Sequence, residues 1–183
     1  MADHLASVSG EGAERIAYIG LGSNLGDGRG NLLLAWRLLA GRDAVRPLVL
    51  SSPWLSSPVA MESAQWFTNA VGRIATGLAP DKLLAELLAV EYAMGRRRRE
   101  GRDRIIDLDI LAYGEATVAE PALTIPHPEM HRRLFVLAPL AEIAPDFVHP
   151  VLLRSAAEML ALLRENAGGQ QIRKTDWPAE AAA

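Results

Sequence analysis

Apolar and polar positions recur along the chain with two different periods, and their order predicts the fold. Strand-like runs of apolar or alternating residues occupy 15–21, 45–52, 67–76 and 104–114. Helical periodicity covers 31–41 and 80–95, and in the second stretch leucines recur three and four positions apart. The order β-α-β-β-α-β predicts an α+β fold, a ferredoxin-like sandwich with an antiparallel sheet and helices on one side.

The rest of the chain predicts additional C-terminal helices and two tails. We expect a turn or short hairpin over 114–124, helical structure over 130–143 and a last helix over 155–166. Half of the 183 residues are hydrophobic, which is enough for one buried core. We therefore expect a single domain over 15–170, with flexible tails at 1–14 and 171–183.

Two acids stand out in the last strand-like run, RIIDLDILAYG. Successive side chains of a strand point to opposite faces, so Asp107 and Asp109 share one face while Ile106, Leu108 and Ile110 share the other. Two carboxylates roughly 6–7 Å apart along a strand suit a hard cation as oxygen ligands. An edge strand with two solvated acids explains the same spacing, and the D-x-D pattern alone leaves that alternative open.

Basic charge is concentrated in one place. The formal net charge is −3, while six arginines against two acids give +4 over 96–104, which leaves −7 for all other residues. A nucleic-acid groove usually shows wider basic coverage and a basic pI, whereas the pI here is about 5.8. The pattern favours a compact anion such as a polyphosphate, with no nucleic acid as a partner.

Composition also limits the compartment. The sequence has no cysteine, which excludes disulfides and thiolate metal sites. Its first residues do not form the basic and apolar regions of a secretory signal, and charged residues interrupt every long apolar stretch. We expect a soluble cytoplasmic protein without membrane contact, and a monomer, with pairing through a sheet edge left open.

Four segments, taken in order, carry a family resemblance. YIGLGSNLGD, WFTNAV, RIIDLDILAYG and IPHPEMHRRLFVLAPLAEIAPD together resemble the hydroxymethyl-dihydropterin pyrophosphokinases of folate biosynthesis, over about residues 15–165. Considered alone, the glycine-rich segment is typical of any tight strand-to-helix turn. The resemblance implies an enzyme that moves the pyrophosphoryl group of ATP to the hydroxymethyl oxygen of a reduced pterin and releases AMP. ATP and the pterin are the implied partners.

The resemblance also implies roles for individual residues. Asp107 and Asp109 would hold two Mg²⁺ ions that bridge the ATP phosphates, and Arg104 and Arg96 would act on the phosphates in catalysis. The positions that match ATP-binding residues of the family are His127, Arg133 and Glu91. The positions that match its pterin pocket are Asn69, Phe67, Phe135, Ser56, Ser57 and Val59.

The chain departs from the family before the acidic strand. Members commonly have Trp-Gly-Pro-Arg or a close variant there, whereas this chain has Gly-Arg-Asp-Arg at 101–104 in a shortened segment without an aromatic residue. Which of the arginines at 96–99 takes the family role therefore stays open. Two other functions are alternatives. The first is a non-catalytic RNA-binding module, but the sequence lacks the aromatic signature expected of one. The second is a magnesium-dependent phosphohydrolase, for which His127 is the one candidate base.

Overall fold

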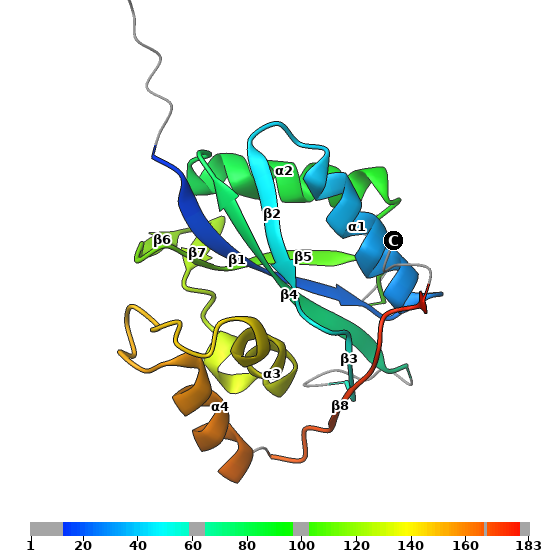
Figure 1. Cartoon of the computed structure of the whole chain (residues 1–183), viewed down its shortest axis with the longest axis vertical. Helices are drawn as coiled ribbons and strands as arrows, with labels where there is room; N and C mark the ends of the chain where they lie inside the picture. The colour runs from blue at the N-terminus through cyan, green and yellow to red at the C-terminus, as the bar shows by residue number, and fades with distance from the viewer. Residues whose placement is uncertain (1–12, 59–64, 97–102, 167, 180–183) are drawn as a thin grey trace, which may run out of the picture.

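The sheet of this protein lies between two layers of helices (Figure 1). The structure is a computed structural model and describes residues 13–58, 65–96, 103–166 and 168–179. Six strands pair in the order β5-β1-β4-β3-β8, and β2 also pairs with β4. All of these pairings are antiparallel.

The strands of the main sheet are β1 (Arg15–Ser23), β2 (Val45–Leu50), β3 (Trp54–Ser56), β4 (Phe67–Thr76), β5 (Asp107–Tyr113) and β8 (Ile172–Lys174). A separate hairpin consists of β6 (Val118–Glu120) and β7 (Leu123–Ile125). The helical elements are α1 (Gly28–Ala40), α2 (Pro80–Ala93), η1 (Met130–Arg132), α3 (Leu134–Ile143) and α4 (Ala156–Glu165). The expected β-α-β-β-α-β order is confirmed as β1-α1-β2-β4-α2-β5, with the short β3 inserted.

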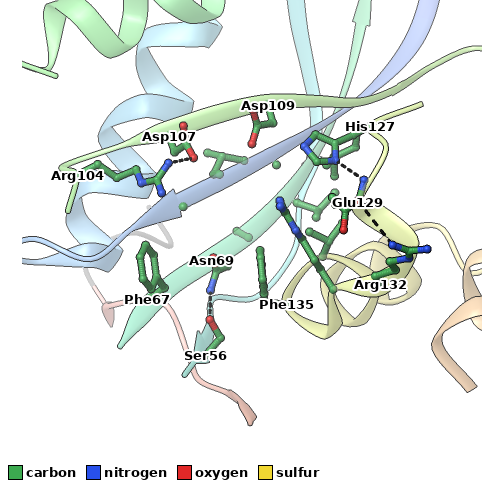
Figure 2. Close-up of a pocket in the computed structure, with 18 of the residues that line it drawn as sticks. Ser56, Phe67, Asn69, Arg104, Asp107, Asp109, His127, Glu129, Arg132 and Phe135 are labelled. Atoms are coloured by element: carbon green, nitrogen blue, oxygen red, sulfur yellow. Dashed lines mark hydrogen bonds and ion pairs between the residues drawn. The ribbon is translucent and has the colours of Figure 1, made fainter. Parts of the chain in front are cut away.

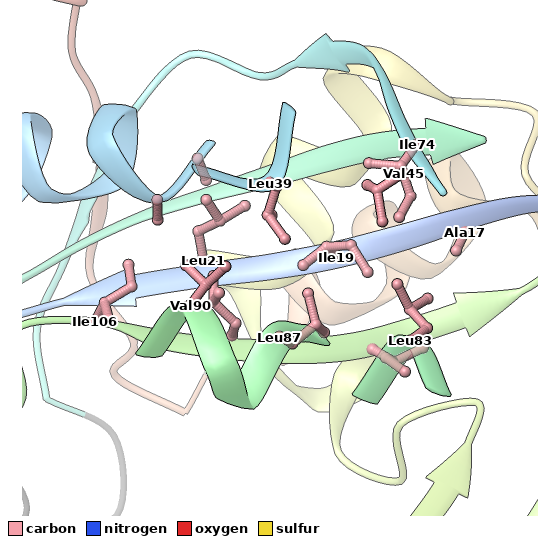
Figure 3. Packing of buried hydrophobic residues seen from close by; sticks show 14 of the residues in the cluster. Ala17, Ile19, Leu21, Leu39, Val45, Ile74, Leu83, Leu87, Val90 and Ile106 are labelled. Atoms are coloured by element: carbon pink, nitrogen blue, oxygen red, sulfur yellow. The ribbon is translucent and has the colours of Figure 1, made fainter. Parts of the chain in front are cut away.

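One face of the sheet packs on α1 and α2. Ile19 of β1 and Ile74 of β4 are fully buried there against Leu39 of α1 and Leu87 of α2 (Figure 3). Burying a leucine or isoleucine side chain contributes roughly 1.5–3 kcal/mol. This core explains why helical periodicity alternates with strand periodicity in the first half of the chain.

The opposite face is covered by the C-terminal helices. Val71 of β4 and Leu111 of β5 are buried against Leu137 and Leu140 of α3, and α4 packs behind that helix. The sequence predicted these helices but not their position, and they form the second layer of the sandwich. The predicted last helix is confirmed as α4, and the structure shows a capping box at Ser155. No helix in the described ranges is long and apolar enough to cross a bilayer.

The tail expected over 171–183 contains ordered structure. β8 pairs with the short β3 and forms the edge of the sheet, and the indole N–H of Trp177 donates to the Ser51 carbonyl at 3.1 Å. Without β8, β3 would be an edge strand with unpaired N–H and C=O groups. Residues 1–12 and 180–183 of the two expected tails lie outside the described residues.

Glu142 of α3 joins the second helical layer to the sheet edge. Its carboxylate accepts the backbone N–H of Ser52 at 3.0 Å and the indole N–H of Trp54 at 3.1 Å, and Lys174 lies 3.3 Å away. Burial alone would raise the pKa of Glu142, but the hydrogen bonds from Ser52, Trp54 and Lys174 bring it below its ordinary value.

We predict that Glu142→Gln lowers the free energy of unfolding at neutral pH by roughly 1.5–3 kcal/mol, because it weakens charge-assisted hydrogen bonds. Since the folded-state pKa of Glu142 is lowered, its contribution is present above the unfolded pKa and is lost as the pH falls through the folded one. The difference in unfolding free energy between Glu142→Gln and the parent should therefore become smaller at acidic pH. Urea unfolding at several pH values measures it, with Glu165→Gln on the exposed end of α4 as a control that should change little.

Candidate functional site

A pocket of about 600 Å³ opens on the sheet face next to α3, across β5, β1 and β4 (Figure 2). The residues singled out from the sequence that line it are Ser56, Ser57, Phe67, Asn69, Arg96, Arg104, Asp107, Asp109, His127, Arg133 and Phe135. These side chains come from β3, β4, β5, α3 and the segments beside them. Val59 lies outside the described residues, as do the arginines at 97–99.

The acidic strand has the two faces that its pattern predicted. Ile106, Leu108 and Ile110 are buried in the core with α1 and α2. Asp107 and Asp109 line the pocket on the other face. Both carboxylates therefore reach the same space, while the alternate residues fix the strand beneath them.

Glycines of β1 form the floor between the acids and Asn69. The sequence placed Gly22 in a turn, but β1 continues through it, and in the sheet Gly22 lies between Asp107 of β5 and Asn69 of β4. A Cβ atom on Gly22 would lie 3.5 Å from the Asn69 Oδ1, and one on Gly20 would lie 3.3 Å from Leu111. Because neither position carries a side chain, the pocket extends down to the backbone of β1. These two glycines were not identified as pocket residues from the sequence.

Two arginines neutralise Asp107. Its Oδ1 lies 2.5 Å from an Nη1 of Arg96, and its Oδ2 lies 2.5 Å from an Nη1 of Arg104. Arg104 also lies 5.9 Å from the centroid of the Phe67 ring. The arginines and the carboxylate at this end of the pocket thus form one cluster, at the start of β5.

Glu91, expected to bind ATP, is not among the residues that line the pocket. It is buried on α2, where it accepts the backbone N–H of Leu108 at 2.8 Å and pairs with Arg96. This carboxylate therefore ties α2 to the start of β5 and helps to orient Arg96. In the sequence, Glu91 is an acid on a helix before the arginine run, and that pattern does not distinguish a structural residue from a ligand-binding one.

The second acid, Asp109, has a raised pKa. Desolvation is the main cause that raises its pKa, and the negative charge of Asp107 raises it further. The protonated form of His127 would partly oppose the shift, and so do the positive charges of Arg133 and Arg104. A cation between the two carboxylates would relieve both the burial and the repulsion.

His127 is held in one tautomer. Its Nδ1 accepts the backbone N–H of Glu129 at 3.1 Å, so the neutral ring carries its proton on Nε2. Burial lowers the pKa of His127, and the nearby charge of Asp109 counteracts part of that change. A neutral ring in this state donates from Nε2 and cannot accept a proton there. Glu129, which fixes the tautomer, also lines the pocket and was missed from the sequence.

The other half of the pocket is flat and aromatic. Figure 2 shows Phe67 and Phe135 on either side of Asn69. The Asn69 amide nitrogen donates to the Trp54 carbonyl at 3.3 Å and to the Ser56 hydroxyl at 3.0 Å. A carbonyl oxygen can only accept, which fixes the orientation of the amide. Asn69 therefore offers the pocket an acceptor, Oδ1, rather than both a donor and an acceptor.

Comparisons with known proteins agree with this geometry. Residues 18–145 match the family described as 7,8-dihydro-6-hydroxymethylpterin-pyrophosphokinase (HPPK). The chain is 44% identical over 133 residues to the 2-amino-4-hydroxy-6-hydroxymethyldihydropteridine pyrophosphokinase of Methylorubrum extorquens, covering 72% of this chain and 84% of that protein. It is 42% identical over 135 residues to the enzyme of the same name from Haemophilus influenzae, covering 73% of this chain and 84% of that protein.

Among solved structures, a crystal structure of Plasmodium falciparum HPPK-DHPS superposes with a TM-score of 0.71 at 15% identity. The match covers 88% of this chain and 45% of that chain, so this chain spans a little under half of its length. At this identity the likeness shows the fold alone, and it confirms the predicted ferredoxin-like α+β architecture.

We predict opposite effects on stability for the two acids in the absence of metal. Asp107→Asn should lower the unfolding free energy by roughly 1–3 kcal/mol, because it breaks charge-assisted pairs with Arg96 and Arg104. Asp109→Asn should hold or raise it, because it removes a buried like charge.

The pH dependence follows from the direction of the Asp109 shift. Because the folded-state pKa of Asp109 is raised, its carboxyl group ionises at a lower pH in the unfolded chain than in the folded protein. The free-energy cost of the buried charge is therefore absent in acid and grows as the pH rises through these two pKa values. Thermal unfolding in a chelating buffer at two pH values measures both variants. A marked loss of stability in Asp109→Asn at neutral pH would show that this carboxylate is satisfied without a cation.

Proposed function

This chain belongs to the 7,8-dihydro-6-hydroxymethylpterin-pyrophosphokinase family, and on that premise we propose that the pocket on β5, β1 and β4 is its active site. The chain transfers the pyrophosphoryl group of ATP to 6-hydroxymethyl-7,8-dihydropterin and releases AMP, as a step of folate biosynthesis. One observation carries the assignment: a cluster of acids and arginines faces a slot of two aromatic rings and an amide across a glycine floor.

The reaction requires two different subsites side by side. The hydroxymethyl oxygen forms a bond to the β-phosphorus of ATP, and the bond from that phosphorus to the oxygen bridging the α-phosphate breaks. AMP leaves with the bridging oxygen, and one proton is released from the hydroxyl group. The polyphosphate needs positive charge, whereas the flat pterin needs apolar surfaces and a polar edge.

Asp107 and Asp109 are the residues that would hold Mg²⁺. Among the described residues no group of three or more Asp, Glu, His or Cys side chains surrounds a common point. Magnesium in nucleotide enzymes is usually held by one or two carboxylates, with phosphate oxygens and waters completing its shell, so a pair of acids fits. Bound there, the metal would neutralise charge on the polyphosphate.

Arginines and His127 would contact the phosphates. Arg104 and Arg96 stand at the carboxylate of Asp107, and Arg133 stands near Asp109. Guanidinium groups form bidentate hydrogen bonds with phosphate oxygens and stay charged across the physiological pH range. His127 would donate a hydrogen bond from Nε2, in keeping with its fixed tautomer.

Asn69 would read the edge of the pterin. With its amide nitrogen engaged by Trp54 and Ser56, its Oδ1 accepts from the N–H groups of the ring. Phe67 and Phe135 would flank the ring, where aromatic contacts contribute roughly 1 kcal/mol beyond area burial. Ser57 lines the same slot.

The two other functions lack support in the described residues. An RNA-binding sheet of this topology needs an open face, but here helices cover both faces outside the pocket. A phosphohydrolase needs a base for water, and His127 in its neutral tautomer has no free acceptor toward the pocket. The cytoplasmic location and the monomeric state stay predictions.

The assay that tests the active site is magnesium-dependent formation of AMP, which should require both ATP and the pterin. Asp107→Asn and Asp109→Asn should each lower turnover at least about 100-fold, because each removes an anionic ligand of the metal. Glu165→Gln should leave turnover unchanged. AMP formation at the parent rate by either aspartate variant would place the metals elsewhere.

Calorimetry tests the pterin slot. Asn69→Ala should weaken pterin binding by roughly 1–3 kcal/mol, because a buried N–H of the ring loses its acceptor, while ATP binding stays near that of the parent. Asn69→Asp should destabilise the fold as well, because it opposes an oxygen to the Trp54 carbonyl. Equal losses of ATP and pterin affinity in Asn69→Ala would make Asn69 a structural residue of the sheet.

A further inference from the structure

We propose that Asn24, which follows β1, is the positioning residue for Arg104. This inference rests on the proposed role of Arg104 at the phosphates and extends it to a residue that does not line the pocket. Asn24 and the segment of Arg104 lie about 80 positions apart in the sequence, and three hydrogen bonds join them.

The contacts of Asn24 hold the backbone of Arg104 from both sides. The Arg104 N–H donates to the Asn24 Oδ1 at 2.7 Å, and the Asn24 N–H donates to the Arg104 carbonyl at 3.1 Å. The Asn24 Nδ2 donates to the Asp103 Oδ1 at 2.5 Å. Asn24 is 6% exposed, so these bonds are largely shielded from water. A short amide is suited to this task, because it offers an acceptor and a donor from one side chain.

This anchoring leaves the Arg104 guanidinium to face the pocket. Its Nη1 reaches Asp107 at 2.5 Å, and its centre lies 5.9 Å from the Phe67 ring centroid. Its Nε is buried without a hydrogen-bond partner in the described part of the chain. The guanidinium therefore stands between the acidic half and the aromatic half of the pocket, where a small shift of its backbone moves it off the reacting phosphates.

The glycine-rich segment YIGLGSNLGD, which runs from β1 into the loop after it, thus has a use that its sequence does not reveal. Within that segment, Asn24 binds the backbone of Arg104, which lies shortly before β5. Asn31, on the first turn of α1, makes comparable bonds, but to Ser23 and Leu25 of its own segment. Because Ser23 and Leu25 flank Asn24, Asn31→Ala shows what loosening this segment costs while the bonds from Asn24 to Arg104 are kept.

The first experiment is a double-mutant cycle on kcat for magnesium-dependent AMP formation. Asn24→Ala should lower kcat about 10–100-fold, as expected for a misplaced contact to the transition state, with little change in KM for ATP or pterin. Because Asn24 acts through Arg104, the double variant should be no slower than Arg104→Ala alone. Asn31→Ala should lower the melting temperature and lower kcat much less than Asn24→Ala does, because Asn24 keeps its own bonds to Arg104.

The second experiment exchanges the hydrogen-bonding groups. Asn24→Asp should lower kcat at least as much as Asn24→Ala, because it opposes a carboxylate to that of Asp103. Asp103→Asn alone serves as the reference, since its new amide can turn its oxygen to Asn24. In the variant that combines Asn24→Asp with Asp103→Asn, the new carboxylate accepts from both the Arg104 N–H and the new amide. Its kcat should therefore recover to within a few-fold of that of Asp103→Asn.

The outcomes separate this inference from the proposed function. Parent turnover in Arg104→Ala would overturn the role of Arg104 at the phosphates. A slow Arg104→Ala together with a fast Asn24→Ala would overturn the inference alone. Additive losses in the cycle, or no recovery in the combined exchange, would likewise show that Asn24 does not act through Arg104.

Discussion

Two carboxylates that share one face of a strand cannot remain close without positive charge, and much of this site answers that constraint. Asp107 and Asp109 point to one space because β5 alternates, and the core on its other face prevents the strand from turning either of them away. Arg96 and Arg104 supply counter-charge to Asp107, while His127 and Arg133 stand near Asp109. The basic groups of the pocket are thus gathered by the acids before any ligand is bound.

The same constraint explains why the counter-ions are arginines. A cation that binds Asp107 competes with two guanidiniums for the same carboxylate oxygens, and each guanidinium displaced keeps its full charge. Among the described residues Arg96 also pairs with Glu91, so Arg104 is the guanidinium that would need a new anion. For the nucleotide and metal proposed above, phosphate oxygens would supply that anion, and binding would exchange partners instead of creating unpaired charge.

Local periodicity accounts for what the sequence predicted, and contacts between distant segments account for what it did not. The bounds of β4, the two faces of β5 and the capped start of α4 follow from residues within a few positions of one another. The pairing of β8 with β3, the buried role of Glu91 and the contact of Asn24 with Arg104 depend on residues that meet only in the fold. Most residues that the family resemblance named line the pocket, whereas Glu91 does not, because a matching position does not show which way a side chain points.

Gly22 shows how closely the backbone and the chemistry are connected. It lies in register between Asp107, which belongs to the charged half of the pocket, and Asn69, which belongs to the aromatic half. A Cβ atom there would contact the Asn69 Oδ1 at 3.5 Å, and any larger side chain would fill the space between the two halves. In the pyrophosphoryl transfer proposed above, the hydroxymethyl oxygen and the β-phosphorus would approach each other in that space, and a strand without a side chain at this point leaves room for them.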